Sequence, residues 1–143
     1  MIHDIRRPNA SRRAVAAAEF ALVLPLLVIL IGGCVDFGRF SHVNITVTNA
    51  ARTGAEFGST HPSTAATELL WQEHVRQAVV DEMAGLDRFD PALLTVTITR
   101  ITEGDHPRVE VDVSYPFKLI GEWPGIPKQL TLRRIVAMPT SRP

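Results

Sequence analysis

The sequence predicts an α+β protein, with an N-terminal transmembrane helix that extends beyond the membrane. A small module of one amphipathic helix packed on about three antiparallel strands should follow. One long apolar run, a second stretch with helical periodicity and two stretches of alternating apolar and polar residues, with a third strand expected after them, support this fold class. We expect a basic cytoplasmic leader at 1–14, the membrane helix at 15–35, a helical extension at 36–59 and the α+β module at 60–143.

The apolar run begins at Ala14 and ends at Val35, with Glu19 as its one charged residue. As a helix, about 22 residues span roughly 33 Å, which is close to the thickness of a bilayer core. Four arginines come before the run: Arg6, Arg7, Arg12 and Arg13. The positive-inside rule therefore predicts a single-pass protein with its N-terminus in the cytoplasm and the chain after residue 36 translocated.

Other interpretations of this run stay open. Its uncharged part, from Phe20 onward, is also close in length to the hydrophobic region of a removable signal peptide. Ile31-Gly32-Gly33-Cys34 fits the pattern before a lipidated cysteine, and Ser11-Arg12-Arg13 is a weaker match to a twin-arginine signal. The alternative is a membrane-anchored lipoprotein or a secreted binding module processed near Cys34. Glu19 and the helical periodicity after the run favour a retained helix.

The helical extension carries apolar side chains at steps of three and four residues, including Phe37, Phe40 and Val47. Val43, Ile45 and Val47 also alternate as strand residues do, but the helical pattern is longer and contains no proline. Four small residues suit close packing against another helix: Ala51, Gly54, Ala55 and Gly58.

The module should begin with an amphipathic helix from Thr64 to Ala84, with Ser63 as N-cap and Gly85 as its stop. Three strands are expected around Leu94–Ile98, Val109–Tyr115 and Leu130–Met138, with a hairpin loop at Glu103–Pro107. The helix would cover the apolar face of these strands.

A loop rich in proline and glycine, YPFKLIGEWPGIPK, joins the last two expected strands. Its large apolar residues include Phe117, Leu119 and Trp123. If they are exposed, they form a partner surface. The other interpretation is that they close the open end of the small sheet.

Charge is balanced over the 143 residues, with 15 Lys and Arg against 15 Asp and Glu. This balance gives no electrostatic basis for nucleic acid as a partner. Cys34 is the single cysteine, so an internal disulfide is excluded. The sequence contains no HExxH, GxSxG, P-loop or dinucleotide glycine pattern. We therefore expect a protein that is not an enzyme, with no catalytic residues, metal site or cofactor.

Three segments follow one another in a fixed order: EFALVLPLL, VDFGRF and TNAARTGAEFGS. Together they resemble the TadE-like family of tight-adherence (Flp, type IVc) pilus assembly proteins, regarded as pseudopilins, over about residues 11–59. The resemblance implies a protein of the bacterial inner (cytoplasmic) membrane with its module in the periplasm. It implies as partners other pilins or pseudopilins, the inner-membrane pilus assembly platform, membrane lipid and a prepilin peptidase.

The resemblance also implies roles for single residues. Pilin-like precursors carry a Glu at the fifth mature position, which places Glu19 there and the cut between Ala14 and Val15. Ala14 stands where the pattern usually has Gly. Glu19 would dock, together with Phe20 and Pro25, by pairing with the new α-amino group of a neighbouring subunit. The other interpretation is that Glu19 reaches the cytoplasmic interface and its water.

Overall fold

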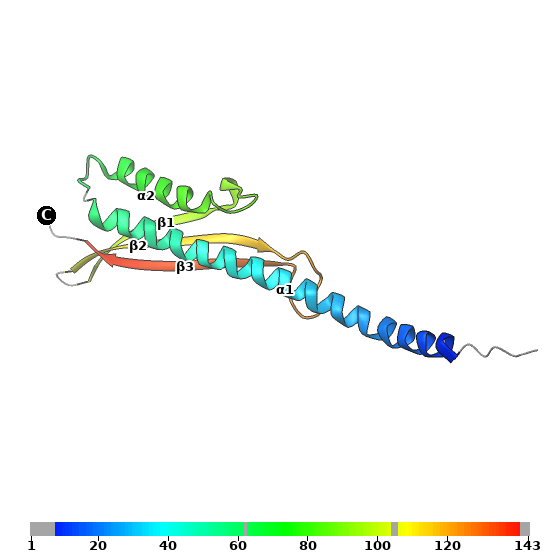
Figure 1. Cartoon of the computed structure of the whole chain (residues 1–143). Coiled ribbons are helices and arrows are strands. Elements are labelled where there is room, and N and C mark those ends of the chain that lie inside the picture. The colour runs from blue at the N-terminus through cyan, green and yellow to red at the C-terminus, as the bar shows by residue number, and fades with distance from the viewer. Residues whose placement is uncertain (1–7, 62, 104–105, 141–143) are drawn as a thin grey trace, which may run out of the picture. The chain divides into compact units, whose positions relative to one another are not determined.

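The computed structural model describes residues 8–61, 63–103 and 106–140. Its elements follow in the order α1 (Pro8–Thr60), α2 (Glu68–Met83), the short 3-10 helix η1 (Pro91–Leu93), β1 (Thr95–Glu103), β2 (His106–Lys118) and β3 (Gln129–Pro139) (Figure 1). The chain forms two compact units, Met1–Phe37 and Gly38–Pro143. The predicted α+β class, with an apolar N-terminal helix before a three-stranded antiparallel sheet, is confirmed.

The first unit contains the apolar part of α1. Its large apolar side chains are all well exposed, from 40% at Leu27 to 82% at Leu22. The helix is long and apolar enough to cross a membrane, and none of its most apolar stretch is buried within the protein. A helix satisfies its own backbone hydrogen bonds, so such a segment is stable in lipid, where water is absent. Pro25 lies inside this helix.

The second unit is built on a sheet with the strand order β1-β2-β3, in which both neighbouring pairs are antiparallel. Val113 of the central strand β2 faces Val96 of β1, and Val111 faces Val136 of β3. Apolar side chains at alternate positions of β2 are therefore buried on one face, as period-two patterning requires. The strands are longer than expected, since β1 continues to Glu103 and β2 begins at His106. The two residues at 104–105, in the expected hairpin loop, lie outside the described residues.

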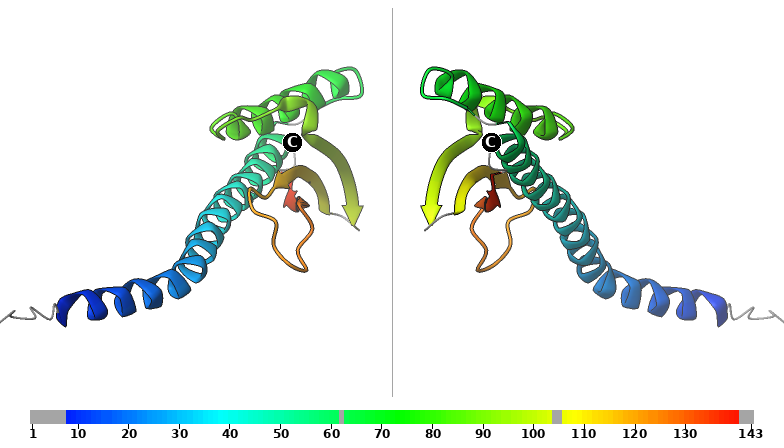
Figure 2. Two further views of the ribbon diagram at one scale, coloured as in Figure 1. Left: turned by 90° about the vertical axis from the view of Figure 1, so that its right-hand side faces the viewer. Right: turned by 90° about the vertical axis from the view of Figure 1, so that its left-hand side faces the viewer.

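The second half of α1 and the whole of α2 lie on this same apolar face of the sheet (Figure 2). Val47, Ala51 and Ala55 of α1 are completely buried in one core with Val75 and Val79 of α2 and the apolar side chains of β2. The sequence prediction assigned the covering of the sheet to the second helix alone. The structure shows that the helical extension shares this role, because its small side chains let its backbone come close.

α2 begins at Glu68, later than the expected start at Thr64. A local turn replaces the first expected turn of helix: the Thr67 N–H donates to the Thr64 carbonyl oxygen at 3.0 Å, and the Thr64 N–H donates to Thr67 Oγ1 at 3.0 Å. Ser63 is therefore not the N-cap, which is Thr67. The Ser63 hydroxyl instead donates to the Glu68 carboxylate at 2.7 Å. At the other end Ala84 is the C-cap, directly before Gly85.

We expect Gly54→Ala to destabilise the folded chain. The added methyl group would lie 2.5 Å from Val79 Cγ2 and 3.3 Å from Val111 Cγ1. Both neighbours are β-branched and packed in the core, so the helices must move apart. The cost of overpacking exceeds the gain in helix propensity, which leaves a net loss of about 1–2 kcal/mol. Thermal unfolding of the full chain in detergent, followed by tryptophan fluorescence, measures this loss.

Gly38→Ala is the matched control on the same helix, because nothing lies within 4 Å of a methyl group there. It should stabilise the chain by up to about 1 kcal/mol through helix propensity alone. Equal rises in the unfolding midpoint for both variants would contradict the close packing at Gly54.

Candidate functional site

The residues predicted to act in processing and docking all lie on α1, in the first unit. Val15 is 56% exposed and Phe20 is 59% exposed, and the side chains of Ala14 and Glu19 are exposed as well. The structure therefore leaves these side chains accessible to another molecule. Their roles in cleavage and docking stay predictions.

The four small residues of the helical extension face the interior of the protein. Ala51 and Ala55 are fully buried, and a Cβ atom at Gly58 would lie 2.9 Å from Val109 Cγ1 and 3.1 Å from Trp71 Cζ2. The helix that comes close to them is thus the chain's own α2, with β2 beneath. The spacing of the small residues indicated that another helix packs closely against them. It did not indicate which helix this is.

Two arginines tie the helices to the edge strands of the sheet, and sequence reasoning missed both. Arg134 of β3 donates to Asn44 Oδ1 at 2.9 Å and to Thr48 Oγ1 at 3.2 Å, both on α1. Arg100 of β1 forms an ion pair with Glu68 of α2, with 3.3 Å between Nη2 and Oε2. Its guanidinium also lies 4.4 Å from the centre of the Trp71 ring, a favourable cation–π arrangement. Each arginine faces inward in an alternating strand, which is the signal that would have identified it.

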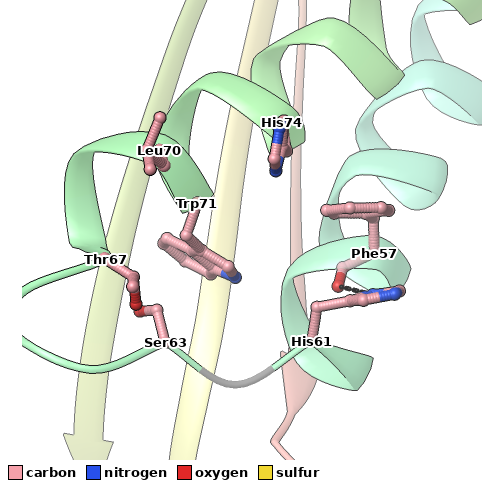
Figure 3. A pocket seen from close by; sticks show the side chains of 7 residues that line it. All are labelled: Phe57, His61, Ser63, Thr67, Leu70, Trp71 and His74. Atoms are coloured by element: carbon pink, nitrogen blue, oxygen red, sulfur yellow. Dashed lines mark hydrogen bonds between the residues drawn. The ribbon is translucent and has the colours of Figure 1, made fainter.

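A pocket of about 310 Å³ opens between the C-terminal end of α1 and the start of α2 (Figure 3). It is lined by aromatic, histidine and hydroxyl side chains with one leucine: Phe57, His61, Ser63, Thr67, Leu70, Trp71 and His74. The His61 ring stacks on Phe57 with 4.2 Å between ring centres, and His74 meets the edge of the same ring at 6.4 Å. Among the described residues, no group of three or more His, Cys, Asp or Glu side chains is placed to hold a metal ion.

The segment predicted as a loop with a possible partner surface begins as part of the core. Phe117 is only 3% exposed and Leu119 only 9%. β2 runs through Pro116 to Lys118, so the alternation of the strand carries Phe117 onto the covered face. For these two residues, burial favours the interpretation that they close the end of the sheet over that of an exposed partner surface. Trp123 is partly buried and lies against Gly121, where a Cβ atom would come within 2.8 Å of the indole nitrogen.

Phe117 instead anchors the end of the sheet to α1. The Phe40 ring meets it edge to face, with 5.7 Å between ring centres, and the Arg39 guanidinium lies 5.4 Å from its centre. Beside this cluster is a second pocket, of about 560 Å³. Its lining comes from α1, the segment after α2 and the end of β2, and it includes Arg39, Arg88 and Lys118.

A model of the TadE-like protein family matches residues 14–56 of the chain. Neither a curated protein nor a solved structure gives a match. The matched segment contains the apolar part of α1, with Glu19, and most of the part that packs on the sheet. The comparison thus confirms the resemblance to the TadE-like family over residues 14–56 and connects the chain with tight-adherence pilus assembly in general.

Proposed function

We propose that the protein is a pseudopilin-like component of the tight-adherence (Flp, type IVc) pilus assembly or secretion machinery, which docks through its N-terminal membrane helix. The family match over residues 14–56 carries the proposal. It is supported by an apolar helical segment whose large side chains are exposed and which is long enough to cross a membrane. The chain would be a single-pass protein of the inner membrane with its module in the periplasm.

Glu19 is the residue with the clearest physical role in this docking. A carboxylate within hydrocarbon costs a few kcal/mol unless it finds a partner. Cleavage between Ala14 and Val15 by a prepilin peptidase would create an α-amino group on each subunit. Pairing the α-amino group of one subunit with Glu19 of its neighbour joins two costly groups in a charge-assisted hydrogen bond. Such a pair would set the register of one helix against the next.

The module would follow the docked helix because α1 belongs to both. Val47, Ala51 and Ala55 of α1 are fully buried in the core of the second unit. A pilin or platform protein that binds the apolar part of α1 would therefore also bring the module to the site of assembly. The module could then contact partners in the periplasm while the apolar part of α1 makes the contacts within the membrane.

The alternative of processing near Cys34 is less well supported. Cys34 lies inside α1, and a cut before it would remove residues 14–33 of the segment that matches the family. The mature chain would also lose Glu19 and the apolar helix that carries the docking proposal.

We expect the N-terminus in the cytoplasm and the module outside it, because the arginines before the apolar run resist translocation. A reporter active only in the periplasm should work when fused after Met138 and should fail when fused before Arg12. The reverse pattern would contradict the proposed orientation. Moving the arginine excess to the other side of the span should weaken or invert insertion.

We expect a cut between Ala14 and Val15, made more efficient by Ala14→Gly, since the smallest residue best fits a peptidase site that accepts little bulk. A bulky residue at position 14 should block the cut. Mass spectrometry of the mature chain measures it: loss of about fourteen residues is expected. Loss of about thirty-three residues with added acyl chains would instead establish the lipoprotein alternative.

We expect Glu19→Gln and Glu19→Ala to leave membrane insertion intact but to abolish co-purification with pilin or pseudopilin partners. Glu19→Asp should be intermediate, because it keeps the charge and shortens its reach by one methylene group. Glu73→Gln, at an exposed position of α2, is the control for loss of a carboxylate elsewhere. Normal pili in cells that carry Glu19→Ala would contradict docking through this residue.

A further inference from the structure

We propose that the pocket beside Phe117 binds the phosphate headgroup of an anionic phospholipid in the leaflet where α1 leaves the membrane. The inference rests on one part of the proposed function, namely that α1 anchors the chain in the membrane. We call this cavity the headgroup pocket. Twelve residues line it: Arg39, His42, Val43, Leu86, Asp87, Arg88, Leu93, Tyr115, Pro116, Phe117, Lys118 and Ile120.

The charge of the headgroup pocket suits an anion. Arg39, Arg88 and Lys118 are the basic lining residues, and Asp87 is the single carboxylate in the lining. Acidic and basic residues are equal in number over the whole chain, so this excess is local. The three cations come from α1, the segment after α2 and the end of β2, and the fold brings them together.

The pocket is also partly apolar, which distinguishes it from a simple phosphate site. Tyr115 and Phe117 are buried beneath it, at 8% and 3% exposure. Two large aliphatic side chains of its lining stay exposed, Ile120 at 68% and Leu93 at 52%. Cations beside exposed aliphatic groups are typical of surfaces that lie at the boundary between headgroups and acyl chains.

Chain connectivity keeps Arg39, one of the pocket's cations, near the end of the expected span. Arg39 follows Val35, the last residue of the expected span, by four residues. These residues lie within the helix α1, in which four residues rise about 6 Å. The headgroup region outside the hydrocarbon core is roughly 5–8 Å thick on each side. Arg39 therefore stays within reach of the lipid phosphates, and each basic residue there gains from an anionic leaflet.

Arg88 has a backbone feature that fits this role. Its φ angle is 59°, in the left-handed region that is uncommon for residues other than Gly, Asn and Asp. Glycine would adopt this conformation at lower cost. Arginine at this position therefore lowers the stability of the fold relative to glycine. A functional need for a cation among the lining residues of the pocket would explain why arginine stands there.

The test uses the full chain purified in a nonionic detergent. Phosphatidylglycerol, phosphatidylcholine with the same acyl chains, and inorganic phosphate are added separately. Lipid retention is measured by native mass spectrometry and stability by the midpoint of thermal unfolding. Phosphatidylglycerol should be retained and should raise the midpoint, phosphatidylcholine should do neither, and inorganic phosphate should have a much weaker effect at the same concentration.

Variants assign the effect to the headgroup pocket. The double variant Arg88→Glu with Lys118→Glu should weaken phosphatidylglycerol binding at least about tenfold, since it reverses two local charges. Asp87→Asn should tighten binding several-fold, and this gain cannot come from misfolding. Arg52→Glu is the control for charge reversal outside the pocket: it reverses one charge at an exposed position about 20 Å further along α1 than Arg39.

Each contrary result overturns a defined part of the inference. Equal effects of the two lipids, or no loss in the double variant, would refute the headgroup pocket. An equal effect of inorganic phosphate would assign it to a free anion instead. A chain that carbonate washing removes from membranes would instead refute the anchor, and with it the proposed function. An anchored chain without lipid preference would refute the pocket alone.

Discussion

The close approach of α1 to α2 and β2 at Gly54 and Gly58 is the constraint on which the second unit depends. Side-chain methyl groups of Val79 and Val109 occupy the space that Cβ atoms would need there, at 2.5 Å and 2.9 Å from those ideal positions. Packed interiors have little free volume, so larger residues would push the helix outward. The buried alanines of α1 would then lose their contacts with the sheet. Two glycines thus make α1 a structural part of the module.

This constraint also lets one helix serve two environments. Its apolar half exposes large side chains such as Leu22 and Ile29, as a lipid-facing helix does. Its second half buries small side chains and directs Asn44 and Thr48 to Arg134 of β3. Both halves can be helical because the backbone hydrogen bonds are satisfied within the helix, whatever surrounds it. The side chains alone decide which half suits lipid and which half packs on the sheet.

The sequence predicted those features that depend on local pattern. Alternation from Val109 to Tyr115 predicted the buried face of β2, and the steps of three and four residues predicted the helical extension through the β-branched Val43 and Ile45. The sequence left open whether Phe117 is exposed or closes the end of the sheet, because the proline before it is typical of a loop. In the sheet, Pro116 is paired with Thr131 and the strand continues. Proline is tolerated where the ladder does not need its missing N–H.

Contacts between segments that are distant in the chain could not be predicted from the sequence. The pairing of Arg100 with Glu68, and the gathering of Arg39, Arg88 and Lys118, depend on which strand edge lies beside which helix. No spacing rule joins positions so far apart in the chain. Glu19 is the opposite case, since the apolar residues directly around it in the sequence were enough to identify it as a candidate functional residue. The chain thus combines a local signal, which marks the apolar helix, with contacts between distant segments, which only the fold determines.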